Sequence, residues 1–132
     1  MVKLSKVMII DDDEISNFIC KQTIQNAGFA DEVIALSGGR EGLDYLSSLQ
    51  EESEIPELIL LDINMPGMNG WEFLDEYNEI LKSLSFKPVL AMLSSSVHES
   101  DLEKANAHND VHDYITKPLT KETLEKLSSN HF

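Results

Sequence analysis

The sequence predicts an α/β fold, a doubly wound sheet of five parallel strands packed against five helices. Short apolar runs of strand length recur along the chain, and a segment that suits a helix follows each of them. The runs are continuous instead of alternating with polar residues, which is typical of strands covered on both faces. The length of 132 residues fits one domain. We therefore expect a single domain over residues 1–132, with its core at about residues 6–130.

The five predicted strands are short runs rich in Val, Ile and Leu. They cover Val7–Ile10, Val33–Leu36, Leu58–Leu61, Val89–Leu93 and Val111–Ile115. Because helical segments separate them, consecutive strands should run parallel and be joined by right-handed crossovers.

The five predicted helices carry apolar residues near helical spacing. They cover residues 14–27, 38–49, about 70–84, about 99–107 and 120–129. The apolar pattern of the first helix consists of Ile15, Phe18, Ile19 and Ile24. Gly28 is expected to end this helix, and Ser37 is expected to cap the second. Cys20 is the only cysteine and is expected to be a small core residue, so no intrachain disulfide forms.

The composition points to protein partners. The chain holds 24 Asp and Glu against 10 Lys and Arg, a formal net charge of -14, and its basic residues form no cluster. This balance argues against direct binding of DNA, RNA or an anionic membrane. The N-terminal residues lack a signal peptide, and no apolar stretch is long enough to span a membrane. A cytoplasmic protein is the expectation.

Acidic residues follow the first and third predicted strands. Asp13 and Glu14 suit the N-terminus of a helix. Helix capping does not account for Asp11 and Asp12, which the fold would place beside Asp62, because neighbouring carboxylates repel unless a cation lies among them. Hard oxygen ligands of this kind suit Mg²⁺, so these three residues predict a metal site.

Two further polar residues are expected at the same edge of the sheet, where doubly wound folds bind their ligands. Ser94 follows the fourth strand, and Lys117 follows the fifth. The serines at positions 94 to 96 also suit the cap of the next helix, and we expect the triplet to serve both purposes. Lys117 precedes Pro118, which favours an extended turn that aims the ammonium inward and makes this bond a candidate for a cis peptide.

Taken in order, these motifs resemble the receiver domain of two-component response regulators, over nearly the whole chain. The matching segments are Ile9-Ile10-Asp11-Asp12, Leu61-Asp62 with Met65-Pro66 and Gly70, Met92-Leu93-Ser94-Ser95, and Lys117-Pro118. The resemblance implies a flavodoxin-like receiver fold with strand order 2-1-3-4-5. It also implies a stand-alone receiver without an output domain, either a chemotaxis-type signalling receiver or a phosphorelay carrier that passes the phosphoryl group to a histidine phosphotransfer domain.

The same resemblance implies a role for each site residue. Asp62 would be the phosphoacceptor, with Lys117 opposite the metal. Mg²⁺, or Mn²⁺ in its place, would be held by Asp11, Asp12, Asp62 and the backbone carbonyl of Asn64.

Other positions are implied to act in switching. Ser94 would move to bond the phosphoryl oxygen, and Tyr114 would turn inward in response, although a Tyr on a last strand also suits plain packing. Asn64 and Ser96 would tune the lifetime of the acyl phosphate. The four histidines have no matched acid or second ligand at convincing spacing and are expected at the surface; they are His98, His108, His112 and His131.

The implied partners are a histidine kinase or a histidine phosphotransfer protein, and a separate downstream target protein. The donor is expected to meet the first helix through Ile15, Ser16 and Phe18. One alternative is a haloacid-dehalogenase-like phosphohydrolase, whose first acidic motif ends in Thr or Val where this chain has Ile15, and which needs an acidic pair after Lys117. Another is a receiver that takes no phosphate and serves only as a binding module.

Overall fold

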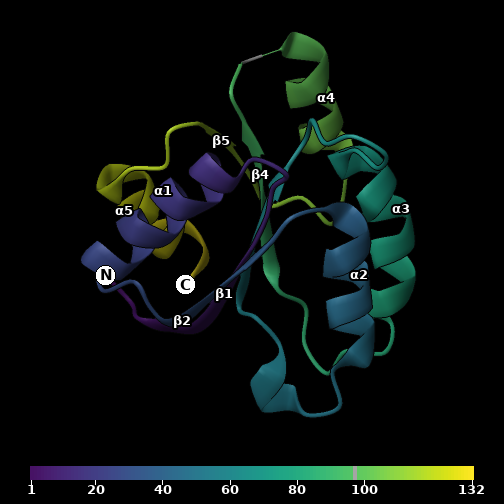
Figure 1. Cartoon of the computed structure of the whole chain (residues 1–132), viewed down its shortest axis with the longest axis horizontal. Coiled ribbons are helices and arrows are strands. Elements are labelled where there is room, and N and C mark those ends of the chain that lie inside the picture. The colour runs from purple at the N-terminus through teal and green to yellow at the C-terminus, as the bar shows by residue number, and fades with distance from the viewer. Residues whose placement is uncertain (97) are drawn as a thin grey trace.

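The computed structural model describes residues 1–96 and 98–132 as a three-layer α/β sandwich (Figure 1). The strands are β1 (Leu4–Ile10), β2 (Ala30–Leu36), β3 (Leu58–Asp62), β4 (Val89–Ser94) and β5 (Asp113–Thr116). The helices are α1 (Glu14–Asn26), α2 (Gly39–Ser48), α3 (Gly70–Leu81), α4 (Glu99–Ala107) and α5 (Lys121–His131), with a 3₁₀ turn at Glu52–Glu54. Within these described residues, no helix is both long and apolar enough to cross a membrane.

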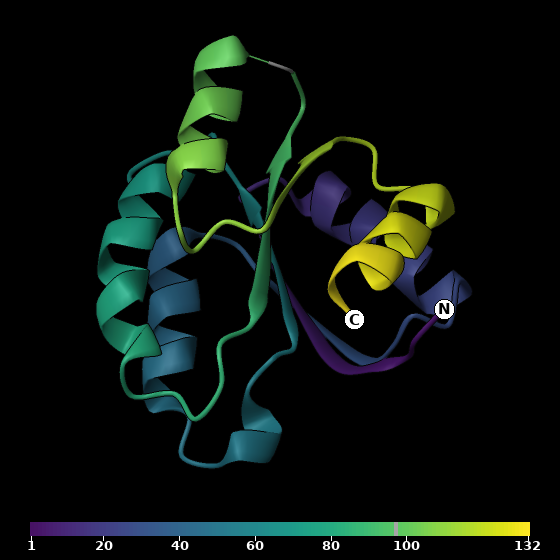
Figure 2. The ribbon, with the colours of Figure 1, turned by 180° about the vertical axis from the view of Figure 1, so that it is seen from behind.

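All neighbouring strands pair in parallel, in the order β2-β1-β3-β4-β5. This confirms the predicted strand order and the doubly wound fold. Helices α1 and α5 cover one face of the sheet, whereas α2 and α3 cover the other (Figures 1 and 2).

The sheet has a separate apolar core on each face. Along β1, Val7 and Ile9 pack on the side of α1 and α5, and Met8 and Ile10 pack on the side of α2 and α3. Side chains of a strand alternate between the two faces. Continuous apolar runs are therefore what a sheet covered on both sides requires, as the sequence predicts.

The boundaries of β1, β2, β5 and α3 differ from the predicted ones. Strands β1 and β2 begin three residues earlier than expected, because Leu4 pairs with Ala30. Strand β5 begins at Asp113 instead of Val111, and α3 ends at Leu81, with turn hydrogen bonds closing the chain up to Leu84.

One expectation about the helices is wrong. The N-cap of α2 is Gly38, not Ser37, and no side chain caps this helix. On α1, only Cys20 and Ile24 are buried, whereas Ile15, Phe18 and Ile19 are exposed by 71%, 64% and 44%. Their spacing is helical, but no element in the described part of the chain covers that side of the helix.

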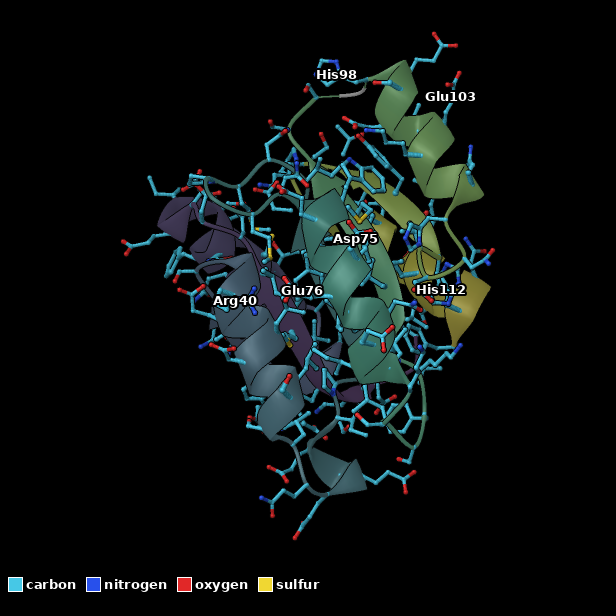
Figure 3. The ribbon with its side chains drawn as sticks, turned by 90° about the vertical axis from the view of Figure 1, so that its right-hand side faces the viewer. Arg40, Asp75, Glu76, His98, Glu103 and His112 are labelled. Carbon is cyan, nitrogen blue, oxygen red and sulfur yellow. The ribbon has the colours of Figure 1, made fainter. Side chains whose placement is uncertain are left out.

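Between α2 and α3, Arg40 donates two hydrogen bonds to the carboxylate of Glu76, at 2.8 and 3.1 Å (Figure 3). Both side chains are about half exposed. Solvent therefore screens this pair, which adds little to the apolar packing of the two helices.

Candidate functional site

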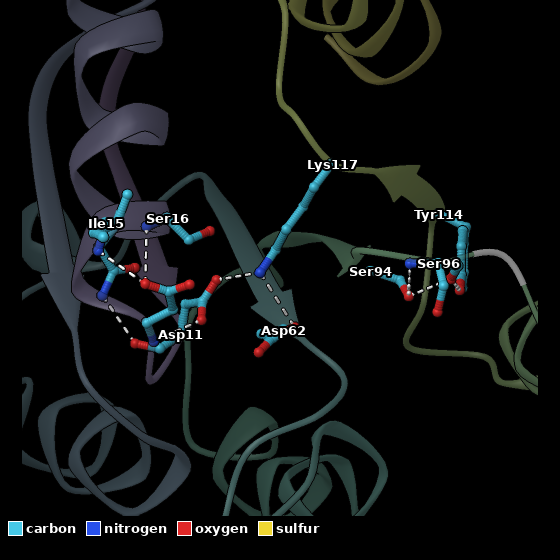
Figure 4. A network of polar contacts seen from close by, with 10 residues as sticks. Asp11, Ile15, Ser16, Asp62, Ser94, Ser96, Tyr114 and Lys117 are labelled. Carbon is cyan, nitrogen blue, oxygen red and sulfur yellow. Dashed lines mark hydrogen bonds and ion pairs between the residues drawn. The ribbon is translucent and has the colours of Figure 1, made fainter.

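The carboxyl ends of the strands bring the predicted site residues to one edge of the sheet (Figure 4). Asp11 and Asp12 follow β1, and Asp62 ends the adjacent β3. Ser94 ends β4, and its carbonyl accepts a hydrogen bond of 2.7 Å from the backbone N–H of Lys117, which follows β5. Residues from four separate segments therefore meet because their strands are parallel and adjacent.

Three carboxylates lie together at this edge. Asp11 is fully buried, Asp62 is 5% exposed and Asp12 is exposed. Their nearest oxygens all lie within 4.8 Å of one another, and no other group of three or more such ligands occurs among the residues that the structure describes. The grouping agrees with the predicted metal site, and its hard carboxylate oxygens fit Mg²⁺.

Lys117 joins two of these carboxylates. Its Nζ donates to Asp11 Oδ2 at 2.6 Å and lies 3.5 Å from Asp62 Oδ1 (Figure 4). The bond between Lys117 and Pro118 is cis, in agreement with the sequence-based candidate. The two contacts with the carboxylates hold the ammonium at the acidic cluster, instead of free in solvent.

The pKa values of the two buried carboxylates shift in opposite directions. Burial and the charge of Asp11 raise the pKa of Asp62 from 3.8 to about 6, against the attraction of Lys117. Burial would also raise the pKa of Asp11, but hydrogen bonds from Lys117 and from the backbone of Asp13 outweigh it and lower that pKa. For Lys117, burial is outweighed by its bonds to the carboxylates, so its pKa is raised and it stays charged.

The loop after β3 holds Asp62 close to the start of α3. Gly67 adopts a positive φ of 81°, which favours glycine. Asn69 caps α3 and forms a reciprocal capping box with Glu72. The N–H of Gly70 donates to the carbonyl of Ile63 at 2.8 Å, and a Cβ at Gly70 would lie only 2.8 Å from the carbonyl oxygen of Asp62.

Asn64 lies in this loop, two residues after Asp62, with an exposed side chain. This position is compatible with the predicted role of its backbone carbonyl, which stays a prediction.

Ser94 is buried, but its hydroxyl is turned toward its own loop. It donates to the carbonyl of Ser96 and accepts from the Ser96 N–H at 3.2 Å. The hydroxyl of Tyr114 reaches the same carbonyl at 3.4 Å (Figure 4). The prediction that the serine triplet caps the next helix is wrong, because His98 is the N-cap of α4 and makes no side-chain cap bond.

The histidines lie apart from the acidic cluster. His98 and His112 are exposed, as predicted, whereas His108 and His131 are half-buried. His131 also has an acidic partner that the sequence analysis missed, because its Nε2 lies 3.1 Å from Asp113 Oδ2. No sequence spacing signals this contact, since the two residues are 18 positions apart on different elements.

The exposed side of α1 borders a shallow pocket of about 270 Å³ beside Lys117. The lining residues are Asp13, Ile15, Ser16, Ile19, Cys20, Ser95, Lys117, Pro118 and Leu119. Apolar side chains thus surround the approach to Lys117 from the α1 side.

Comparison with known proteins gives a family match over most of the chain. A family model described as the response regulator receiver domain matches residues 7–128. The nitrate/nitrite response regulator protein NarL of Escherichia coli K12 is 38% identical over 120 residues, which cover 91% of this chain and 51% of NarL. The chain spans about half the length of the curated relatives it matches.

Two solved structures extend this similarity to the fold. A two-component response regulator from Cytophaga hutchinsonii has a TM-score of 0.89 and 34% identity, with 97% of this chain and 96% of that chain covered. The chemotaxis protein CheY4 of Vibrio cholerae has a TM-score of 0.75 and 25% identity, with 98% and 99% covered.

Proposed function

Because this chain belongs to the response regulator receiver domain family, we propose that it is a phosphorylation switch whose Asp62 accepts a phosphoryl group from a phosphohistidine on a partner protein. Phosphoryl acceptance is general to this family. One observation carries the assignment to Asp62: its carboxylate ends β3 next to the carboxylates of Asp11 and Asp12, within reach of the ammonium of Lys117.

In the transfer step, a carboxylate oxygen of Asp62 forms the new O–P bond while the N–P bond of the phosphohistidine breaks. The electron pair of the broken bond stays on the leaving imidazole. With a pKa of about 6, Asp62 is mostly ionised at neutral pH and has the lone pair that the attack requires. Lys117, 3.5 Å from Asp62, is placed to offset negative charge on the phosphoryl oxygens.

Receivers generally bind Mg²⁺, and the acidic cluster fits this ion. Asp11, Asp12 and Asp62 would hold it, together with the backbone carbonyl of Asn64. When bound, the ion supplies positive charge that stabilises the phosphoryl oxygens during transfer.

The switch proposed here starts at Ser94. Its hydroxyl must leave the carbonyl of Ser96 to reach a phosphoryl oxygen on Asp62. Because Tyr114 contacts the same carbonyl, a change at Ser94 alters the contacts of Tyr114 as well. Asn64 follows Asp62 by two residues, Ser96 follows Ser94 by two, and both are exposed polar residues, which supports their proposed influence on water access and phosphate lifetime.

The most direct test is incubation of the protein with acetyl phosphate and Mg²⁺, followed by intact-mass measurement. The wild type should gain the mass of one phosphoryl group, and Asp62→Asn should gain none. A wild type that stays unlabelled, or a variant labelled as fully, contradicts the proposal. Sustained turnover of p-nitrophenyl phosphate would instead support the phosphohydrolase alternative, which the family match does not favour.

Receivers interact with histidine kinases or phosphotransfer proteins. For this chain, we place the donor on α1, whose exposed Ile15 lines the pocket beside Lys117 and whose Phe18, three residues further along the helix, is also exposed. Exposed apolar side chains of this size are typical of interaction sites. The reaction belongs in the cytoplasm, where receivers usually act.

Phe18→Ala tests this docking surface. Truncating an apolar interface anchor costs about 1 kcal/mol or more, so transfer from the cognate kinase should slow by about fivefold or more. Labelling by acetyl phosphate should stay unchanged, because this small donor does not need α1. Val2→Ala serves as the control, since Val2 is exposed by 50% and lies outside α1. Equal slowing with both donors, or the same effect from Val2→Ala, would argue against docking through Phe18.

The signal would pass to a separate target protein through the surface near Tyr114.

A further inference from the structure

Asn17 of α1 holds the backbone of the acidic pair. Its side-chain Nδ2 donates a hydrogen bond of 2.8 Å to the carbonyl oxygen of Asp11. The bond joins the first turn of α1 to the point where the chain leaves β1. Sequence analysis did not single out Asn17; the only signal it offers is an amide on the first helix, six positions after Asp11.

With this bond, each polar group of Asp11 has its own partner. The N–H of Asp11 donates to the carbonyl of Leu36, and its Oδ1 accepts from the N–H of Asp13 at 2.9 Å. Its Oδ2 accepts from Lys117. The carbonyl is held by the neutral side chain of Asn17, and it belongs to the peptide unit that leads into Asp12.

The hydrogen bond from Asn17 to Asp11 leaves another buried polar atom without a partner among residues 1–96 and 98–132. Only the nitrogen of the Asn17 amide can donate to a carbonyl, so the side-chain oxygen must point the other way. That oxygen is buried and accepts no hydrogen bond from the described residues. A buried acceptor without a partner is destabilising, so the amide is poorly explained as a device for stability alone.

We propose that Asn17 is a positioning residue for the metal site: its amide grips the carbonyl of Asp11 and so orients the carboxylates of Asp11 and Asp12 for Mg²⁺. This inference rests on the proposed function, in which these two residues bind the ion. Groups that hold ligands in place typically change metal affinity by 10- to 100-fold when removed, without touching the ion themselves.

The test is calorimetric titration of the full chain with Mg²⁺, for the wild type and for Asn17→Leu. Leucine has a similar size, cannot donate, and also removes the orphaned oxygen. We expect the dissociation constant for Mg²⁺ to rise by about tenfold. The midpoint of urea unfolding in EDTA should fall no further than that of the control Thr23→Val, which removes a hydrogen bond from Thr23 Oγ1 to the Ile19 carbonyl on the same helix, away from the site.

An unchanged Mg²⁺ affinity in folded Asn17→Leu would overturn the inference, and so would an equal loss of affinity in Thr23→Val. Asn17→Ala is titrated in parallel, so that a folding defect of the leucine variant leaves the same two outcomes measurable. Failure of the proposed function looks different: the wild type itself would then bind no Mg²⁺ or take no phosphate on Asp62.

Discussion

At the scale of single residues, the pKa values of two neighbouring carboxylates are shifted in opposite directions. Asp11 receives the closest contact of Lys117 and a backbone N–H, and its pKa falls. Asp62 receives the weaker contact of the same ammonium, together with burial and the charge of Asp11, and its pKa rises to about 6. Of these two carboxylates, the proposed nucleophile is thus the one whose charge the protein compensates less. Its ionised form destabilises the folded state.

Asp62→Asn should make the metal-free protein more stable at neutral pH. The carboxyl of Asp62 ionises near its ordinary 3.8 in the unfolded chain and near 6 in the folded one, so the folded state binds more protons between these values. The penalty is therefore absent below about pH 4, grows as pH rises, and is complete above about pH 6. At about pH 8 the variant should gain roughly 2–3 kcal/mol in the free energy of unfolding, and near pH 4 the gain should vanish.

Urea unfolding in EDTA at both pH values measures this difference. Asp12→Asn is the matched control, because it removes one acidic charge from the same cluster at an exposed position. A gain for Asp62→Asn that is the same at both pH values, or that Asp12→Asn reproduces, would contradict burial as the cause.

At the scale of elements, the N-terminal caps of the helices fix the loops that lead into them, including those at the site. Helices α1, α3 and α5 are capped by the side chains of Asp13, Asn69 and Thr120. The first residue of α3, Gly70, has no room for a side chain. A Cβ there would meet the backbone of Asp62, the residue that would carry the phosphate. By contrast, α2 starts at Gly38, whose extended φ of -175° suits any residue.

Gly70→Ala should destabilise the protein by roughly 1–3 kcal/mol, because an added methyl would overpack a tight contact. Its Cβ would lie 2.8 Å from the Asp62 carbonyl oxygen and 2.8 Å from Cε of Met92. The backbone oxygen cannot yield without moving Asp62, so phosphorylation by acetyl phosphate should slow in the same variant. Urea unfolding and the labelling rate measure the two effects.

Gly38→Ser provides the matched control at another helix start. A Cβ there would meet only the carboxylate of Glu41, the flexible end of a side chain, which can turn aside. The serine would add the missing N-cap, with Glu41 three residues on as in a capping box, so stability should rise by about a few tenths of a kcal/mol. If both substitutions had the same effect, close packing at Gly70 would not be its cause.

At the scale of the whole molecule, the parallel order of the strands makes the site. Asp11, Asp62 and Lys117 are far apart in sequence, yet they lie at the carboxyl ends of β1, β3 and β5 and meet at one edge of the sheet. The predicted fold and the grouping of the three acids are confirmed for this reason, because both depend on apolar runs and on residues at their ends, which can be read along the chain. The strand order, which the resemblance to receiver domains implies, is confirmed as well.

Other features of the helices depend on what another element covers. The apolar spacing of Ile15, Phe18 and Ile19 does not by itself say which of them are buried; α5 and the sheet cover only the side of α1 with Cys20 and Ile24. Ser37 has the chemistry of a cap, but the chain enters α2 one residue later, at Gly38. In each case the local pattern is satisfied by more than one arrangement, and packing selects among them.

The sequence by itself determined the doubly wound sheet, its covered faces and the acids at its edge, because strand periodicity and parallel topology follow from local patterns. Only the tertiary structure decided that Lys117 bonds Asp11 more closely than Asp62, that the Ser94 hydroxyl turns toward Ser96, and that α1 presents an apolar surface. These features are contacts between separate elements and the exposure of a helix face. They arise only when the elements pack, and they determine the charge distribution at the site and the surfaces through which the switch would work.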